Sequence, residues 1–398
     1  MATGLLHYPG PIHSSSPAID AGISYQQPRG VPLYGKILDD SPLMPVLNGL
    51  KQWASASRID WSRRTSTPVP FPEEIEEGDI AKVAAYSMGL KEIGALCQMV
   101  NLDNPEDAFS ALVALSAMVT RAHQKQQRAV MHSLTAAQLR RYAEEGHPQC
   151  RTVCIKLLLR LWGPQIPAVE FVNYLDDNER AVHEETALMI LRSHIDDKDR
   201  LCEVAHAIHA LRPTGRALQT IKGVVASMGS SEDPEVRDAM SIVLASLGFV
   251  SNASSLLLSA GAVPPLMKHK SATCDQVNHM VLHCLHCLTE TEEGCYAVMD
   301  EGGSYHFIGE LTGITSTGTY RETVFEDPDA SKSTYLVEGI FKSLLTFAHT
   351  FSGKEELRAL GAVQIAQNMM RTQEFSINPR ATVIKERYAL PMIDLLFR

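Results

Sequence analysis

The segment Ser259–Leu311 reads SAGAVPPLMKHKSATCDQVNHMVLHCLHCLTETEEGCYAVMDEGGSYHFIGEL and contains three successive helical patterns. The first follows Gly261 and opens on Pro264-Pro265, where proline is tolerated because its missing N–H would have no helical partner. The second runs over about Asp275–Thr289. The third runs over about Glu293–Met299. This succession predicts a chain built from short packed helices.

The helical pattern also restarts at a regular interval. The third helix is expected to end at Gly302-Gly303, because glycine permits the left-handed stop. A new apolar pattern then begins at Tyr305-His306-Phe307-Ile308. The interval from Gly261 to Gly303 is about 42 residues, which is typical of the unit of a helical solenoid.

Three strings carry a resemblance to a known family. Ala260-Gly261-Ala262-Val263-Pro264-Pro265-Leu266 resembles the opening of an armadillo repeat, and a weaker form returns at Leu360-Gly361-Ala362-Val363-Gln364-Ile365. Asp233-Pro234-Glu235-Val236-Arg237-Asp238-Ala239 resembles the second helix of a HEAT or armadillo unit. The resemblance covers roughly residues 80–398 and matches no single named protein. It implies an all-α fold, a right-handed α-solenoid.

Beyond the opening segment as well as within it, the helical pattern begins again at several positions, which divide the chain into about seven degenerate armadillo/HEAT-like repeats. These points are Gly89, Ser133, Gly163, Gly215, Gly261, Gly303 and Gly361. The repeat domain is expected to span 79–398. Within it, residues 312–333 are polar and lack a helical period, which predicts a loop inserted inside one repeat.

Residues 1–78 have a different character, because proline and serine break any helical period there. We expect a largely irregular segment with one short amphipathic helix over Leu43–Trp53. That helix either caps the first repeat or belongs to an extended arm that docks into the groove or onto a partner. The run Arg63-Arg64-Thr65-Ser66 fits a basophilic kinase site, a pattern that also occurs by chance.

Composition limits the class of partner. The formal net charge of −10 argues against non-specific nucleic-acid or anionic-membrane binding, since both need basic patches. It is compatible with a partner that carries a basic or extended segment. No apolar run reaches the ~18 residues of a membrane span. There is no secretory signal pattern, and the eight cysteines form no disulfide framework, which favours a cytoplasmic or nuclear location.

The sequence holds no specific catalytic signature. The motifs GxxxxGK[ST], GxGxxG after a strand, GxSxG and HExxH are all absent. Cys284 and Cys287 have CxxC spacing, but they fall in mid-helix near the apolar side, where packing is the expected role. We therefore predict no enzyme, no catalytic residue and no cofactor.

The second helix of the opening segment has two distinct faces at 100° per residue. Val277, Val281, Cys284 and Leu288 share the face expected to form the core. The opposite face carries His279, His283, His286 and Glu290. In proteins that resemble armadillo arrays, the polar side of the last long helix of each unit lines the concave groove. If this helix is that one, three imidazoles and a carboxylate line the groove. The face could contact a peptide in a pH-sensitive way, hold a metal through His279 and His283, or simply be solvated; we predict no metal.

The corresponding helix of the next repeat shows the same division. Its expected core face is Val337, Ile340, Phe341, Leu344, Ala348 and Phe351, and its polar face includes Tyr335, Glu338, Lys342, Thr346 and His349. Tyrosine and charged residues on adjacent helices are what a peptide groove uses, although any soluble helix has a polar face.

Together these patterns predict a non-enzymatic scaffold or adaptor that binds a segment of another protein in the concave groove. The predicted partner-binding residues are His279, His283, His286, Glu290, Tyr335, Glu338, Lys342 and His349. The alternative is a regulatory or chaperone-cofactor subunit that clamps a folded ATPase or motor domain. The chain ends just after Leu395-Leu396-Phe397, where a polar capping helix is expected, so we expect either dimerisation there or a last helix packed inward.

Overall fold

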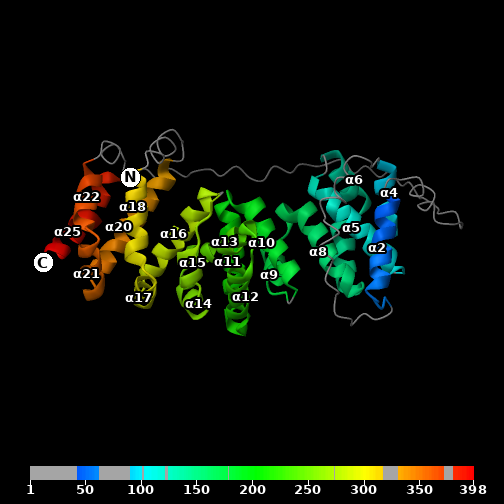
Figure 1. Ribbon diagram of the computed structural model, residues 1–398, viewed down its shortest axis with the longest axis horizontal. Helices are drawn as coiled ribbons and strands as arrows, with labels where there is room; N and C mark the ends of the chain where they lie inside the picture. Colours follow the sequence, from blue (N-terminus) through cyan, green and yellow to red (C-terminus); the bar gives the residue numbers. More distant parts are fainter. Residues whose placement is uncertain are drawn as a thin grey trace, which may run out of the picture.

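The computed structural model describes residues 43–61, 90–100, 103–121, 124–177, 179–272, 274–316, 330–371 and 380–398. All regular structure in these ranges is helical. The helices follow one another along the long axis of the molecule in chain order, from α2 at one end to α25 at the other (Figure 1). The predicted all-α solenoid is confirmed. Its repeat number and handedness stay predictions.

The C-terminal half is built from units of three helices, of which the third is the longest. The first such unit is α14 (Ser254–Ser259), α15 (Val263–Lys268) and α16 (Asp275–Thr289). The next is α17 (Glu292–Asp300), α18 (Gly303–Ser316) and α20 (Ala330–Ala348). The last is α21 (Phe351–Ala359), α22 (Ala362–Met370) and the segment α24 (Ala381–Ile384), η4 (Lys385–Ala389) and α25 (Leu390–Phe397). The three helices predicted from the opening segment are α15, α16 and α17.

The units before them are less uniform. The helices are α4 (Leu90–Met99), α5 (Pro105–Arg121), α6 (Gln124–Ser133), α7 (Ala136–Glu145), α8 (Pro148–Trp162), η1 (Gly163–Gln165), α9 (Ala168–Leu175) and α10 (Arg180–His194). They are followed by α11 (Lys198–Ala210), η2 (Arg212–Thr214), α12 (Arg216–Ser230), α13 (Pro234–Ser246) and η3 (Leu247–Phe249). The short helices α6 and α14 were not predicted from the sequence.

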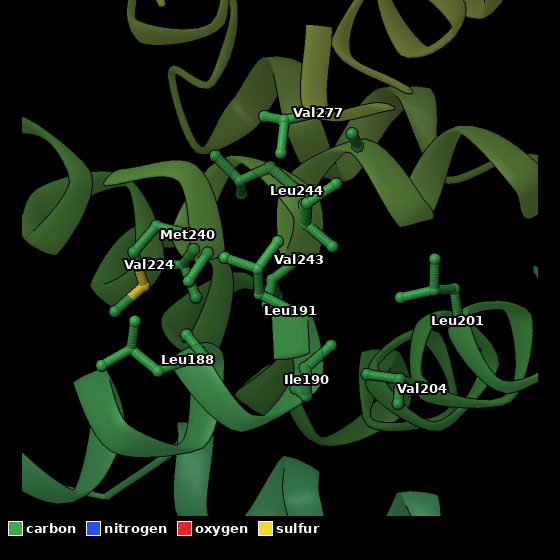
Figure 2. Packing of buried hydrophobic residues seen from close by; sticks show 14 of the residues in the cluster. Leu188, Ile190, Leu191, Leu201, Val204, Val224, Met240, Val243, Leu244 and Val277 are labelled. Carbon is green, nitrogen blue, oxygen red and sulfur yellow. The ribbon is translucent and has the colours of Figure 1, made fainter. Parts of the chain in front are cut away.

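The long helices stack into a single row that holds the units together. In that row α5 packs on α8, α8 on α10, α10 on α13, α13 on α16, and α16 on α20. Figure 2 shows Leu191 of α10, Val243 and Leu244 of α13, and Val277 of α16 meeting between successive helices. The buried apolar residues form one cluster from Leu43 to Leu396. Each large buried aliphatic side chain contributes roughly 1.5–3 kcal/mol.

Four glycines mark the same turn in four successive units. Gly215, Gly261, Gly302 and Gly361 all have φ between 70° and 88° and precede the second helix of their unit. A Cβ is strained in this left-handed region, which is why glycine recurs there. The predicted restart points need two corrections. The left-handed residue is Gly302 and not Gly303, and Gly215, Gly261 and Gly361 lie inside the units and not at their starts.

The N-terminal helix α2 (Met44–Ala56) packs on α5. Its Leu43, Leu47 and Leu50 are buried, and Trp53 stacks on Phe109 with ring centroids 5.8 Å apart. This contact agrees with a helix that covers the first repeat. The boundary at residue 78 and the Arg63–Ser66 motif lie outside the described residues.

Two predictions about the later repeats are wrong. Phe351 does not belong to the core face of α20: it begins α21 and is 86% exposed. The predicted loop 312–333 is shorter at both ends, because α18 continues to Ser316 and α20 begins at Ala330. At the C-terminus, Leu396 packs inward while Phe397 is 72% exposed. No described helix is long and apolar enough to cross a membrane.

A buried carboxylate fastens α13 to the connection between α15 and α16. Ser271 donates to Asp238 Oδ2 at 2.6 Å, and His269 Nε2 lies 2.9 Å from Asp238 Oδ1. The Asp238 and His269 side chains are only 5% and 7% exposed. Asn278 of α16 exchanges two further hydrogen bonds with the backbone of Ser271. Burial at this depth is tolerated because these polar atoms find partners.

Replacing Asp238 with alanine should destabilise the solenoid by about 2–4 kcal/mol, because it leaves the buried Ser271 hydroxyl without its acceptor and removes the carboxylate beside His269. Urea unfolding of the full chain followed by circular dichroism measures this. Asp300→Ala, at an exposed position at the end of α17, should stay within about 0.5 kcal/mol of the native chain. Equal stabilities for the two variants would show that the carboxylate does not hold the connection.

Candidate functional site

The candidate site lies on α16, where three units of the solenoid meet. A pocket of about 390 Å³ opens between the end of α10, the start of α11, η3, α16 and α20. Half of its lining residues are apolar: Ile195, Leu201, Phe249, Met280, Leu282, Leu336 and Ile340. The remaining lining residues are Asp196, Lys198, Gln276, His279, His283, His286 and Gly339. We call this the anchor pocket.

The predicted core face of α16 is confirmed, since Val277, Val281, Cys284 and Leu288 are all buried. Of the three alternatives for the opposite face, a fully solvated histidine face does not fit the structure. His279, His283 and His286 are half-buried, and all three line the anchor pocket. Glu290 at the end of the same face is exposed. The cause is that α16 is flanked by α13 on one side and α20 on the other, so little of its circumference reaches water.

His286 is part of the contact between α16 and α20. Its Nδ1 lies 3.0 Å from Ser343 Oγ, which is 2.9 Å from Thr289 Oγ1. A Cβ on Gly339 would meet the imidazole carbons at 3.1–3.2 Å, so glycine lets the α20 backbone approach the ring. Burial lowers the pKa of His286 to about 4, and the charge of Lys342 acts in the same direction. The ring is therefore neutral at neutral pH.

His283 stands between the anchor pocket and the η3 turn. Its ring lies 5.0 Å from that of Phe249, and its Nε2 is 3.6 Å from Cys287 Sγ. Burial lowers its pKa, and Lys198 acts in the same direction. The idea that these imidazoles titrate near their usual pKa and so sense physiological pH does not hold for His283 or His286.

The charged residues of the predicted site join adjacent repeats. Lys342 of α20 forms an ion pair with Glu290 of α16. The hydrogen bond to Glu290 raises the pKa of Lys342. Glu338 of α20 pairs with Arg380 Nη1 at 2.8 Å and accepts a hydrogen bond from Tyr388 at 3.4 Å. Both carboxylates therefore already have a cationic partner within the chain, although Glu290 is still exposed.

Two predicted residues lie apart from this cluster. His349 is exposed at the end of α20. Tyr335 falls within α20, but its side chain is outside the described residues. The structure therefore brings together His279, His283, His286, Glu290 and Lys342, with Glu338 on the side of α20 that contacts the last unit. It leaves His349 at the periphery.

Sequence reasoning missed Phe249 and Lys198, which form the opposite wall of the anchor pocket. Lys198 Nζ lies 5.0 Å above the centre of the Phe249 ring, within cation–π range. Both residues belong to the preceding unit, so no periodicity along α16 could reveal them. The one available signal was the apolar Phe249-Val250 pair that continues beyond the end of a helix.

The site offers no evident metal-binding geometry. Within the described residues, no three His, Cys, Asp or Glu side chains are grouped so as to hold a metal ion. Cys284 is fully buried, and burial raises the pKa of Cys287 to about 11. A protonated thiol is a poor nucleophile and a poor ligand.

Comparison with known proteins gives structural neighbours only. No family model matches the chain, and no curated protein matches it either. A designed armadillo repeat protein is 13% identical with a TM-score of 0.38, covering 77% of this chain and 100% of that one. Another, solved with the peptide (KR)4, is 13% identical with a TM-score of 0.36, covering 77% and 99%.

A third neighbour comes from a structure concerning a phosphorylation switch in the interaction between cadherin and β-catenin. It is 14% identical with a TM-score of 0.46, covering 92% of this chain and 69% of that one. At these identities and TM-scores, the partners and functions of the neighbours cannot be assigned to this chain. The solenoid assignment rests on the packing of this chain's own helices.

Acid should weaken the fold through His286. Well above about pH 6.5 the His286 imidazole is neutral in both the folded and the unfolded chain, so its titration does not change the free energy of unfolding there. As pH falls from about 6.5 to about 4, the unfolded chain takes up a proton that the folded site resists, so the free energy of unfolding decreases. The depression of the pKa corresponds to about 3 kcal/mol.

The measurement is urea unfolding of the native chain and His286→Asn across this pH range. Asparagine can still hydrogen-bond to Ser343 but does not titrate. The variant should lose less stability on acidification than the native chain, while His349→Asn, at an exposed histidine, should follow the native curve. If the free energy of unfolding fell equally with pH in all three proteins, His286 would not be the source of the acid sensitivity.

Proposed function

We propose that the chain is a protein-binding scaffold whose anchor pocket holds a side chain from a segment of a partner protein. The observation that carries the proposal is the pocket itself: an apolar cavity of about 390 Å³ with a few polar groups at the junction of three units. Its volume falls in the roughly 300–1,000 Å³ range of ligand sites, and such pockets hold the anchors of peptide interfaces.

The rigidity of the surroundings supports this role. One side of the pocket comes from α16 and α20, two packed helices of the row, and His286 on that side contacts Ser343 and lies against Gly339. A preformed pocket costs little ordering on binding. The scaffold and adaptor role and the cytoplasmic or nuclear location belong to the proposal.

A substitution that fills the pocket tests the proposal. Gln276 is half-buried on the first turn of α16 and lines the pocket, so Gln276→Trp should place an indole at its mouth. Peptides selected from a phage-displayed random library on the native chain should lose at least about tenfold in affinity for this variant. Fluorescence anisotropy with synthetic copies of the selected peptides measures the loss.

Gln364→Trp provides the matched control, because Gln364 is exposed on α22, outside the pocket. It should bind the selected peptides as the native chain does. Peptides that bind native chain and Gln276→Trp equally would refute the pocket as the binding site. Failure to select any peptide would favour the alternative, a solenoid that clamps a folded ATPase or motor domain.

A further inference from the structure

A second pocket adjoins the anchor pocket across Phe249. It has a volume of about 690 Å³ and is lined mainly by the turn from Gly248 to Ser255, with Arg212 on one side and Cys287, Glu290 and Thr291 on the other. We call it the turn pocket. Phe249 belongs to the lining of both pockets, and α16 runs along both, from Gln276 in the anchor pocket to Glu290 in the turn pocket.

The turn pocket is more polar than the anchor pocket. Ser251, Asn252, Ser254 and Ser255 contribute hydroxyl and amide groups, whereas half of the residues that line the anchor pocket are apolar. The Phe249 ring is held in place by His283 at 5.0 Å. A ligand long enough to cross this ring meets an apolar subsite on one side and a hydrogen-bonding subsite on the other.

The open charges of the two pockets are mainly positive. Lys198 in the anchor pocket and Arg212 in the turn pocket are both exposed, and neither forms an ion pair within the part of the chain that the structure describes. The one carboxylate of the turn pocket, Glu290, is neutralised by Lys342. Asp196 at the edge of the anchor pocket is the single open carboxylate of the two linings.

His283 and His286 add no charge to this balance at neutral pH. His283 and His286 are half-buried, and burial lowers the pKa of both rings. The anchor pocket therefore presents neutral, largely apolar walls beneath the cation of Lys198. Such walls favour an uncharged side chain inside, because an unpaired charge would lose its hydration there.

Building on the proposed function, we infer that the two pockets together bind an acidic segment of a partner protein. A large apolar or aromatic side chain enters the anchor pocket, and carboxylates of the same segment face Lys198 and Arg212 across Phe249. This reverses the charge expected from the net charge of −10. Glu290 is paired with Lys342. The two linings therefore hold two open cations, Lys198 and Arg212, against one open carboxylate, Asp196.

Peptide selection on the full chain tests the sign of the charge on the partner segment. Peptides that bind through the anchor pocket, identified by their loss on Gln276→Trp, should be enriched in aspartate and glutamate next to an apolar residue. Lys198→Glu should weaken them about tenfold, and the native affinity should fall as salt is raised. Arg212→Glu should act in the same direction.

Two controls separate local charge from overall charge. Lys222→Glu changes the net charge by the same amount at an exposed position on α12, outside both pockets, and should leave affinity within about twofold. Asp196→Asn should leave affinity unchanged or raise it, since it removes the one open carboxylate.

The outcomes distinguish this inference from the proposed function. Pocket-dependent peptides that are neutral or basic, or that bind Lys198→Glu as well as the native chain, would overturn the inference and leave the scaffold proposal standing. If no peptide depends on the anchor pocket, the proposed function and this inference are both wrong. Acidic, pocket-dependent peptides that are lost on Lys198→Glu would establish it.

Discussion

The stacking of each long helix between two neighbours is the constraint on which the rest of the structure depends. No unit of this chain can bury its apolar surface alone, because both flanks of its long helix are apolar. The row α10, α13, α16 and α20 solves this by covering each helix from both sides. The resulting burial is the main source of stability, so stability resides in the contacts between units more than within them.

The same stacking determines what polar residues can do. A polar side chain on a flank of the row must find a partner in the neighbouring unit, since water is excluded there. Three contacts of this kind join one helix of the row to a neighbouring segment: Asp238 with Ser271, His286 with Ser343, and Arg160 with Glu185. These contacts give the buried polar groups their partners and also help to set how neighbouring units align.

The pockets arise where the stacking is incomplete. The η3 turn inserts Phe249 between α11 and α16, and the space on either side of that ring is left unfilled. One side of each pocket is formed by α16, which belongs to the row, while η3 and the turn after it supply most of the turn pocket. This combination of unfilled apolar space and a packed helix beside it is what makes α16 the candidate binding element.

The sequence by itself determined the fold class, the bounds of α16 and its core face, because these follow from local chemistry. Proline and glycine determine where the turns occur. The 3.6-residue period places Val277, Val281, Cys284 and Leu288 on the same inward face of α16. Local periodicity did not establish that Phe351 begins a new helix, because the helix ends at a turn whose signal, the Thr350 cap, is a single residue.

Only the tertiary structure decided the environment of the histidines and the composition of the site. A period along one helix divides it into two faces but cannot show that a neighbouring helix covers part of the polar one. His283 and His286 became neutral pocket walls because η3 and α20 lie against them. Lys198 and Phe249 joined them from the preceding unit, and contacts between units are not written in the local pattern of any single helix.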